Sequence, residues 1–348
     1  MIADSQPVSG LSAVSEWVER TLNSQGKILE RIDTSVNRGR RNYAAFRLIA
    51  YLKAVRAVVE IERNTTIYIP IHHGVTLLPQ TFIAMIVILR NMRLIVHHHS
   101  FLPITKPNIL MHRFAHGLIF KKAEHIFLTE RMESAYVKVW GNSLKNWVVY
   151  NDAVAVDRLK NFTFDRIDKG NNIVLMHASN LTVAKGSYFT LELFDRILRK
   201  YPNVSCILLG PTSDDGIAFK IKSVFEDFPD RFTYISSFDT STLATNLRRS
   251  DIFVFPSSYS NEASPLVLLE AQYMGNIVLG SDVGAISEIV LQPGRVVALN
   301  EFQATLENLV NQFFKNIKPS LDAVDFSRII INRGQIARET LSLIFGED

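Results

Sequence analysis

The amino-acid sequence predicts an α/β fold with two domains, each a parallel β-sheet covered by helices. Short β-branched or apolar runs alternate with helix-length windows along the chain, the pattern of strands joined by crossover helices. Its 348 residues are enough for about two domains, and 47% hydrophobic with 21% charged residues excludes disordered and collagen-like chains. The one cysteine, Cys206, excludes a disulfide scaffold and is expected to be a buried small hydrophobic residue in a reducing compartment.

In the first half of the chain, five strands alternate with five helices. Strands are predicted over residues 27–32, 66–71, 94–98, 125–129 and 147–150. The longer windows predict helices over residues 11–22, 42–62, 76–90, 107–122 and 131–140. The longest apolar run, Phe82–Leu89, is far shorter than the ~20 residues of a membrane-spanning helix, so we expect a core helix there. The N-terminus has no signal-peptide pattern, which favours a cytoplasmic protein.

The second half repeats the alternation. Strands are predicted over residues 172–176, 204–209, 232–235, 252–255, 277–279 and 296–299, with helices between them. Residues 152–171 have no clear periodicity and read as a linker, so we expect a first domain over 1–152 and a second over 153–325. A last helix, within 326–348, is expected to return to the first domain. Two open parallel sheets place ligands at the carboxyl ends of their strands, which suits an enzyme that joins two substrates.

The charge is divided unevenly between the halves. Residues 1–150 hold 19 Lys and Arg against 10 Asp and Glu, whereas residues 151–348 hold 19 against 24. The basic first domain is therefore expected to face an anionic partner, either a membrane surface, a phosphorylated acceptor or nucleic acid. Nucleic acid is disfavoured because no recognition module is visible.

Eight of the nine histidines lie in the basic half. A zinc site of His72, His73 and 97–99 is a rival interpretation, but no Cys or acidic partner has metal spacing nearby, so no metal is expected. His112 and His116 lack the Glu of the zinc-protease signature, and we expect them on the basic face of a helix, opposite its apolar face. The basic face would also carry Arg113, Lys121 and Lys122, and the apolar face Ile109, Leu110, Phe114 and Leu118. Such a basic face would rest on anionic lipid or be solvated.

The segment 251–271 carries the most chemical information. A buried strand ends at Pro256, a polar loop follows, and a helix is expected to start with Ser264 as N-cap and Pro265 at its first position. A helix N-terminus after a parallel strand binds anions. Glu262 precedes this terminus and Glu270 lies about two turns inside the helix, where carboxylates suit sugar hydroxyls. The alternative is that Glu262 is a solvated charge in the loop and Glu270 a residue on the helix surface.

This segment resembles the retaining GT-B glycosyltransferases of family 4. Glu262 and Glu270 have the spacing of the family's Glu-x7-Glu signature, and residues 275–290 are similar to its Gly-Thr-Pro-Val-Val-Ala-Ser-Asp segment. Residues 179–186, Ser-Asn-Leu-Thr-Val-Ala-Lys-Gly, stand in the place of its Gly-Arg-Leu-x-x-x-Lys-Gly loop, and residues 150–157 resemble its Asn-Gly-Val-Asp turn more loosely. The resemblance implies a GT-B fold, two Rossmann-like domains facing a central cleft.

The resemblance also implies roles for particular residues. Glu270 would hold the ribose hydroxyls of a nucleotide-sugar, Glu262 would contact its sugar, and Lys185 would neutralise the departing diphosphate. The sugar and diphosphate site would further include Ser264 and the backbone amides of Leu266 and Val267. In the first domain, Gly10 would lie near the donor phosphates, and His98 or His99 would contact the donor sugar near the reacting carbon.

Three departures from the family pattern bear on the site. Asn180 replaces the arginine five positions before Lys185, residues 263–265 replace a Gly-Phe-Gly, and Ile277 replaces a proline. Only nine residues precede Gly10, so little room is expected for the family's first strand. These departures motivate an alternative: a catalytically weak GT-B scaffold that binds a partner.

The implied function is a retaining transfer of sugar from a UDP- or GDP-sugar to a glycan or lipid-linked glycan, in surface polysaccharide or glycoconjugate synthesis. The absence of any Asp-x-Asp argues against a metal-dependent GT-A enzyme, so no cofactor beyond the donor is expected. The expected location is the cytoplasm, with peripheral contact at the inner face of the membrane through the basic domain. A GT-B sugar-nucleotide epimerase is a further alternative.

Overall fold

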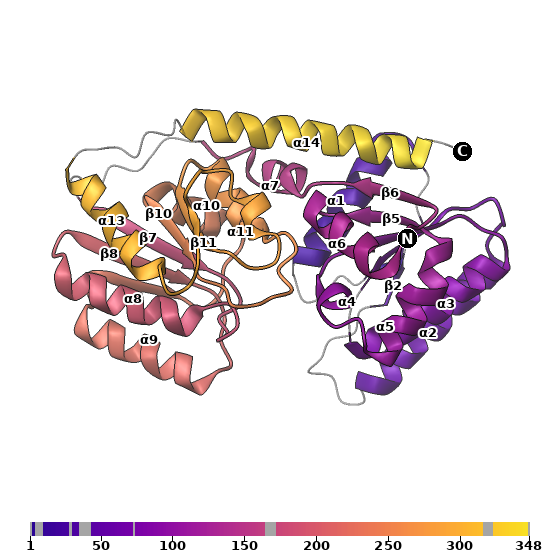
Figure 1. Ribbon diagram of the computed structural model, residues 1–348, viewed down its shortest axis with the longest axis horizontal. Coiled ribbons are helices and arrows are strands. Elements are labelled where there is room, and N and C mark those ends of the chain that lie inside the picture. Colours follow the sequence, from indigo (N-terminus) through magenta and orange to yellow (C-terminus); the bar gives the residue numbers. More distant parts are fainter. Residues whose placement is uncertain are drawn as a thin grey trace. The chain divides into compact units, whose positions relative to one another are not determined.

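The protein divides into two compact units. The computed structural model describes residues 2–3, 10–27, 30–34, 43–71, 74–163, 172–315 and 323–346. Unit 1 consists of residues 1–154 and 335–348, and unit 2 of residues 155–334. The second boundary falls inside the C-terminal helix α14 (Ala323–Gly346), so the segment 326–348 is shared between the units (Figure 1).

Unit 2 is built on a six-stranded parallel sheet. Its strands are β7 (Ile173–Ala178), β8 (Val204–Leu209), β9 (Phe232–Ile235), β10 (Ile252–Phe255), β11 (Ile277–Ser281) and β12 (Val296–Val297). Their order is β12-β11-β10-β7-β8-β9, and every pair is parallel. The chain winds from β7 to β9, then crosses to β10 and winds the other way. Ligands of such sheets bind beyond the carboxyl ends of the strands at this switch point, here between β7 and β10.

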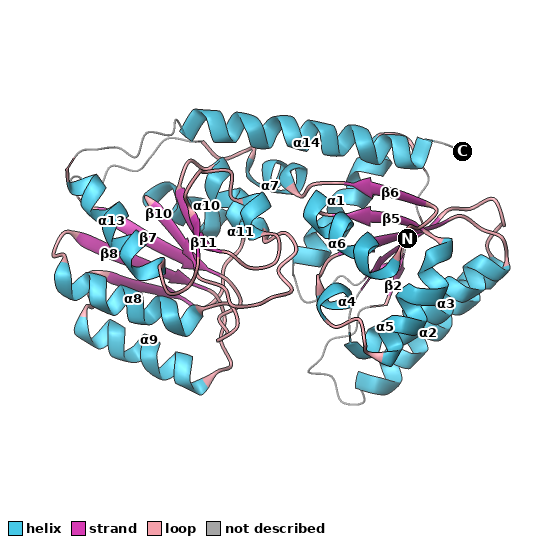
Figure 2. Ribbon diagram, viewed as in Figure 1, coloured by secondary structure: helices cyan, strands magenta, loops and turns pink. Residues whose placement is uncertain are grey.

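Helices cover both faces of this sheet (Figure 2). One face packs on α8 (Ser187–Lys200), α9 (Asp215–Asp227) and α13 (Phe302–Phe314). The other packs on α10 (Thr240–Arg249), α11 (Leu266–Tyr273), α12 (Ile286–Ile289) and residues of α7 (Asp152–Leu159). Alternate strand residues face opposite layers: Leu175 contacts the first set of helices and Met176 the second. Cys206 is buried in this core as predicted, and burial raises the pKa of its thiol.

Two predicted features of unit 2 need correction. Residues 152–171 do not begin as a linker, because α7 occupies the first eight of them. Ala153 and Leu159 are completely buried on this helix, and the charged residues between them hide the apolar periodicity. Likewise α11 begins at Leu266 and is preceded by Pro265, so Ser264 is not its N-cap.

Unit 1 contains a four-stranded parallel sheet, in the order β3 (Ile67–Ile71), β4 (Leu94–His98), β5 (Glu124–Phe127) and β6 (Lys145–Val148). A short strand β1 (Ile2–Ala3) pairs in parallel with β2 (Ile32–Asp33) and lies against β3. The segment before α1 thus holds a strand of two residues, which belongs to a two-stranded sheet with β2 and not to the four-stranded sheet. The strand predicted over 27–32 is shifted to 32–33, and residues 28–29 lie outside the described ranges.

The helices of unit 1 are α1 (Gly10–Ser24), α2 (Tyr43–Glu60), α3 (Leu77–Leu89), α4 (Leu102–Thr105), α5 (Leu110–Phe114) and α6 (Glu130–Trp140). The helix predicted over 107–122 is not uniform, because α5 continues as the π-turn η2 (Ala115–Ile119) and the 3-10 turn η3 (Phe120–Lys122). No helix in the described part of the chain is long and apolar enough to cross a membrane.

The end of α14 packs on unit 1, which confirms the predicted return of the C-terminal helix. Gln25 Nε2 donates to Ser342 Oγ at 2.6 Å, and Arg93 Nη2 donates to the Ile344 carbonyl oxygen at 2.7 Å. The side chains of Leu341 and Ile344 are completely buried.

Candidate functional site

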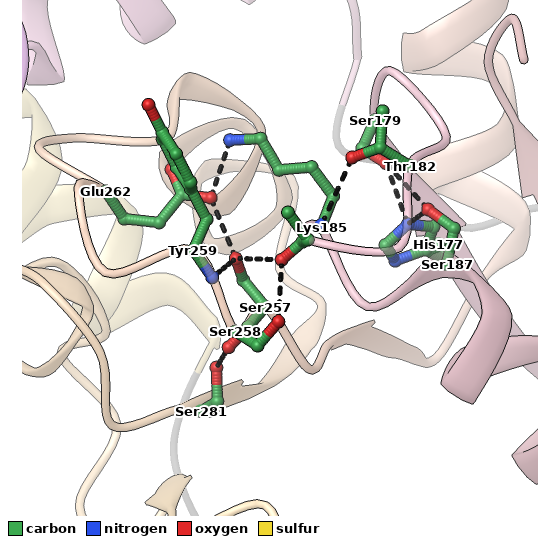
Figure 3. A network of polar contacts seen from close by, with 11 residues as sticks. His177, Ser179, Thr182, Lys185, Ser187, Ser257, Ser258, Tyr259, Glu262 and Ser281 are labelled. Carbon is green, nitrogen blue, oxygen red and sulfur yellow. Dashed lines mark hydrogen bonds and ion pairs between the residues drawn. The ribbon is translucent and has the colours of Figure 1, made fainter. Parts of the chain in front are cut away.

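The loops after β7 and β10 bring a cation and a carboxylate together at the switch point of unit 2 (Figure 3). Lys185 follows β7, Glu262 follows β10, and their atoms Nζ and Oε1 are 2.5 Å apart. Glu262 is 4% exposed, whereas the Lys185 side chain is 28% exposed, so the lysine faces solvent more than its partner does. Two residues 77 positions apart, both singled out in the sequence, therefore lie in one site.

Two further residues of the β10 loop complete the surroundings of this ion pair. Ser257 Oγ donates to the same Glu262 oxygen at 2.9 Å. The ring centroid of Tyr259 lies 5.2 Å from Lys185 Nζ, within the range of a cation–π contact. Neither residue was predicted from the sequence, although both lie in the loop directly after a buried strand, where ligand-binding residues of parallel sheets are expected.

The backbones of the two loops are joined directly. Ser258 N donates to the Ala184 carbonyl oxygen at 2.9 Å, and the Ser258 hydroxyl donates to the same oxygen at 3.2 Å. Gly186 begins α8 with φ +72°, and a Cβ at this position would lie 2.0 Å from the Pro256 carbonyl oxygen. The close approach of the loops therefore requires glycine here.

A third loop, after β11, holds Glu262 from another side. Ala285 N donates to the Glu262 carbonyl oxygen at 2.9 Å. Gly284 has φ +56°, and a Cβ there would lie 2.1 Å from that oxygen. Ser281, at the end of β11, donates through its hydroxyl to the Ser257 carbonyl oxygen. The carboxylate thus projects from a backbone that is fixed by the ends of three adjacent strands.

His177 links the same strands beneath the loops. Its Nδ1 lies 2.8 Å from the Val254 carbonyl oxygen, which can only accept, so Nδ1 carries the proton. Nε2 then accepts from Ser179 Oγ at 2.9 Å. Burial, helped by the nearby charge of Lys185 and opposed by the Val254 hydrogen bond, lowers the pKa of His177 to about 4. The imidazole is neutral and joins β7 to β10.

Unit 2 is therefore expected to lose stability in mild acid through His177. Its pKa is depressed in the folded state, so its contribution is complete above the unfolded pKa near 6.5 and is lost as pH falls toward about 4. Between pH 7 and pH 5, the wild type should lose ~2 kcal/mol more unfolding free energy than His177→Gln, which cannot titrate. Urea unfolding of both proteins at the two pH values measures this, and parallel losses would contradict it.

A second ion pair joins α11 to α7. Glu270 is 2% exposed, and its Oε1 is 3.1 Å from Arg158 Nη1. Burial raises the pKa of Glu270, and the guanidinium opposes this rise. Arg158 comes from α7 and also donates to Thr240 Oγ1 at 3.3 Å. The predicted surface-helix alternative for Glu270 is thus wrong, and Arg158 adds a cation that no motif indicated.

The remaining predicted residues of unit 2 lie around these two pairs. Leu266 and Val267 are the first two residues of α11, where backbone amides have no partner within the helix. Ser264 is half-buried in the loop before this terminus, and Asn180 is exposed just after β7. In unit 1, Gly10 is the exposed first residue of α1.

The histidines of β4 point in opposite directions. His98 is completely buried, with Nε2 2.8 Å from His125 Nδ1 and its ring stacked on Phe127 at 4.7 Å. His99 is half-buried, 4.2 Å between ring centroids from His97, whose pKa burial lowers to about 3. His98 has the surroundings of a core side chain, so the contact with a donor sugar is proposed for His99 alone.

The described ranges contain no zinc site of the kind considered from the sequence. His72 and His73 fall outside them, and no group of three or more potential metal ligands occurs among the residues that the structure covers.

Two units with parallel sheets, one of them with the candidate site at its switch point, are typical of the GT-B class of fold, and comparison with known proteins agrees. HepE from Anabaena, in complex with UDP-glucose, aligns with a TM-score of 0.67 at 16% identity, over 98% of each chain. A structure described as trehalose-6-phosphate from E. coli bound with UDP-2-fluoro glucose aligns with a TM-score of 0.69 at 12% identity, over 99% of this chain and 97% of the other.

Sequence comparison also finds a family similarity in unit 2. Residues 157–323 match the model of the family described as glycosyl transferases group 1. An uncharacterized glycosyltransferase of Methanocaldococcus jannaschii is 24% identical over 179 residues, 48% of this chain and 42% of the relative. The chain thus spans less than half the length of this curated relative.

Proposed function

We propose that the protein is a retaining, metal-independent glycosyltransferase that uses a UDP- or GDP-sugar as donor. The observation that carries this proposal is the contact between Lys185 and Glu262 at the switch point of the unit 2 sheet. A cation beside a helix N-terminus suits a diphosphate, and a buried carboxylate beside it suits sugar hydroxyls. The bound UDP-glucose of HepE, which shares the fold, supports a UDP-sugar as the first donor to test.

The chemistry follows from the charges. The bond between the anomeric carbon and the diphosphate oxygen breaks, while the acceptor hydroxyl oxygen forms a bond to that carbon on the same face. The acceptor proton passes to the departing phosphate oxygen. Lys185 and the first amides of α11 stabilise the negative charge that develops on the diphosphate. Glu262 and Glu270 accept hydrogen bonds from donor-sugar and ribose hydroxyls, and Arg158 holds Glu270 in place.

The proposed acceptor is a glycan or a lipid-linked glycan, in surface polysaccharide or glycoconjugate synthesis. The catalytically weak scaffold is less well supported than the sequence suggested. It rests on Asn180 and on the short N-terminus, where β1 has two residues. Against it, Glu262 is buried and held by several hydrogen bonds, and a scaffold that only binds a partner would not need a carboxylate fixed in this way.

A panel of UDP- and GDP-sugars tests the proposal. Saturation-transfer NMR measures binding, and release of nucleoside diphosphate measures turnover, with and without a glycan acceptor. We expect one donor to bind and to be turned over, and Glu270→Ala to weaken its binding while the exposed Glu226→Ala does not. Failure of every sugar to bind would remove the proposal. Interconversion of donors without an acceptor would instead indicate an epimerase.

A further inference from the structure

A long stretch of unit 1 has no acidic residue. Between Glu62 and Glu124 the sequence contains no Asp or Glu, but seven Lys or Arg residues. Five of the seven are exposed, and four of these five lie within residues 106–122: Lys106, Arg113, Lys121 and Lys122. Of the four exposed basic residues in 106–122, Arg113 lies on α5 and Lys121 and Lys122 lie on η3, while Lys106 directly follows α4.

Helix α3 has two apolar faces and no charged residue. Ile83, Ala84 and Val87 are completely buried in the core. Leu78, Phe82 and Leu89, however, are 55%, 50% and 75% exposed. The prediction of a core helix over this apolar run is therefore correct for one face of α3 and wrong for the other, where large apolar side chains are exposed. A helix that is apolar all round normally has its whole surface covered.

The segment after α4 shows the same exposure, and it corrects the predicted faces. His112 and His116 are buried: His116 Nδ1 lies 3.2 Å from Tyr136 Oη, and His112 Nδ1 lies 2.8 Å from the Lys106 carbonyl oxygen. The apolar residues expected on the buried side are exposed: Ile109 by 43%, Leu110 by 82%, Phe114 by 42% and Leu118 by 59%. The basic Arg113, Lys121 and Lys122 are exposed with them.

Helix α2 adds a third exposed stripe. Tyr51, Ala54 and Val58 are buried against the core. The exposed apolar residues of α2 include Leu48, Ile49, Leu52 and Val59. Helix α2 packs on α3, and α3 packs on η2 and η3, so the three stripes belong to neighbouring elements (Figure 1). We call the exposed apolar residues of α2, α3 and 109–118, with the four exposed basic residues of 106–122, the apolar-basic surface.

We infer that the apolar-basic surface binds a membrane that contains anionic lipid. Apolar side chains of this kind enter the boundary between headgroups and acyl chains, while lysine and arginine pair with lipid phosphates. Exposed apolar groups gathered on neighbouring elements mark an interaction site rather than ordinary surface. The inference rests on the proposed function, because a lipid-linked acceptor is held in such a membrane.

Charge distinguishes a membrane from a second copy of the chain. In a two-fold symmetric contact the same surface meets itself. Helix α2 carries the acidic Glu60, which pairs with Arg56 of the same helix, and the segment from Arg63 to Ala123 supplies only positive charge. Two copies would therefore place the exposed basic residues of 106–122 against each other. An anionic lipid surface is complementary to both the charge and the apolar side chains.

Flotation with lipid vesicles tests the inference. The wild type is expected to bind vesicles of phosphatidylcholine with phosphatidylglycerol, to bind phosphatidylcholine alone much less, and to be released by salt. The doubly substituted Leu110→Ser, Leu118→Ser protein should bind about tenfold more weakly or worse, as should Lys121→Gln, Lys122→Gln. The control is Phe219→Ser on α9, which removes a 75% exposed aromatic from unit 2 and should change nothing.

Two results would overturn the inference. One is equal vesicle binding by the wild type and the leucine variant. The other is a wild-type oligomer, measured by light scattering, that the leucine variant converts to monomers while neither protein binds vesicles. Donor binding is measured on the same samples without lipid. Vesicle binding without donor binding would support the membrane-binding role of the apolar-basic surface and contradict the proposed function. Donor binding without vesicle binding would contradict only the membrane-binding role.

Discussion

Replacing Lys185 by Ala is expected to lower kcat for donor turnover by about 10²–10³-fold, with a smaller change in KM. The ammonium group acts mainly on charge that develops as the diphosphate leaves, so its loss affects the transition state more than the bound donor. Steady-state release of nucleoside diphosphate, with the donor identified by the panel, gives both constants. The assignment also predicts that Lys185→Arg recovers part of the activity, because it restores a cation.

The control for this substitution is Lys222→Ala, on the same unit. The Lys222 side chain is 74% exposed and pairs with Glu226 one helical turn away, so its removal should leave kcat unchanged. Because Lys185 contacts Glu262 directly, the effects of Lys185→Ala and Glu262→Gln should not add in the double variant. If Lys185→Ala kept the wild-type kcat, Lys185 would not stabilise the departing diphosphate.

Replacing Gly284 by Ala is expected to cost about 3 kcal/mol or more of unfolding free energy and to abolish tight donor binding. The new Cβ would lie 2.1 Å from the Glu262 carbonyl oxygen, so backbone must move, and the carboxylate moves with it. Urea unfolding gives the free energy, and titration with the donor gives the dissociation constant. Gly186→Ala, with its Cβ 2.0 Å from the Pro256 carbonyl oxygen, should behave similarly.

Gly294 provides the matched control. It has φ +68°, close to the φ of Gly284, but a Cβ added there meets no atom within 4 Å. Gly294→Ala therefore measures the left-handed backbone cost alone, about 1–2 kcal/mol, and should leave donor binding intact. Equal losses of stability and donor affinity in the two variants would show that the contact with Glu262 is not what requires glycine.

Much of unit 2 was predictable from sequence because its strands are short runs rich in apolar residues, and the central ones, β7 and β10, are completely buried. The strands beginning at Val204, Phe232 and Ile252 match their predicted bounds, since polar or turn residues end each run. The two residues of the Lys185–Glu262 ion pair were also predictable as site residues. Glu262 has the family spacing to Glu270, and Lys185 belongs to the Lys-Gly at the end of the β7 loop. Strand order, which places Lys185 beside Glu262, was not visible in the sequence.

The features that were missed depend on contacts between distant parts of the chain. Arg158 lies in α7, whose charged residues made the segment resemble a linker in the sequence. Its partner Glu270 lies in α11, far later in the chain, so no local pattern joins the two residues. The faces of 107–122 were predicted from a regular α-helical period, but the π-turn at 115–119 changes that period. His98 alternates as expected, whereas its burial among His125 and Phe127 follows from the neighbouring strand.

The division of α14 between the units has a consequence for how the protein is made. Unit 2 is one continuous stretch, residues 155–334, whereas unit 1 needs residues 335–348 as well as the first 154. Domains fold as units as the chain emerges from the ribosome. The unit that is synthesised first is therefore completed last: the strands around Tyr68 and Arg93 acquire their contacts with Phe345 and Ile344 only after all of unit 2 has been translated.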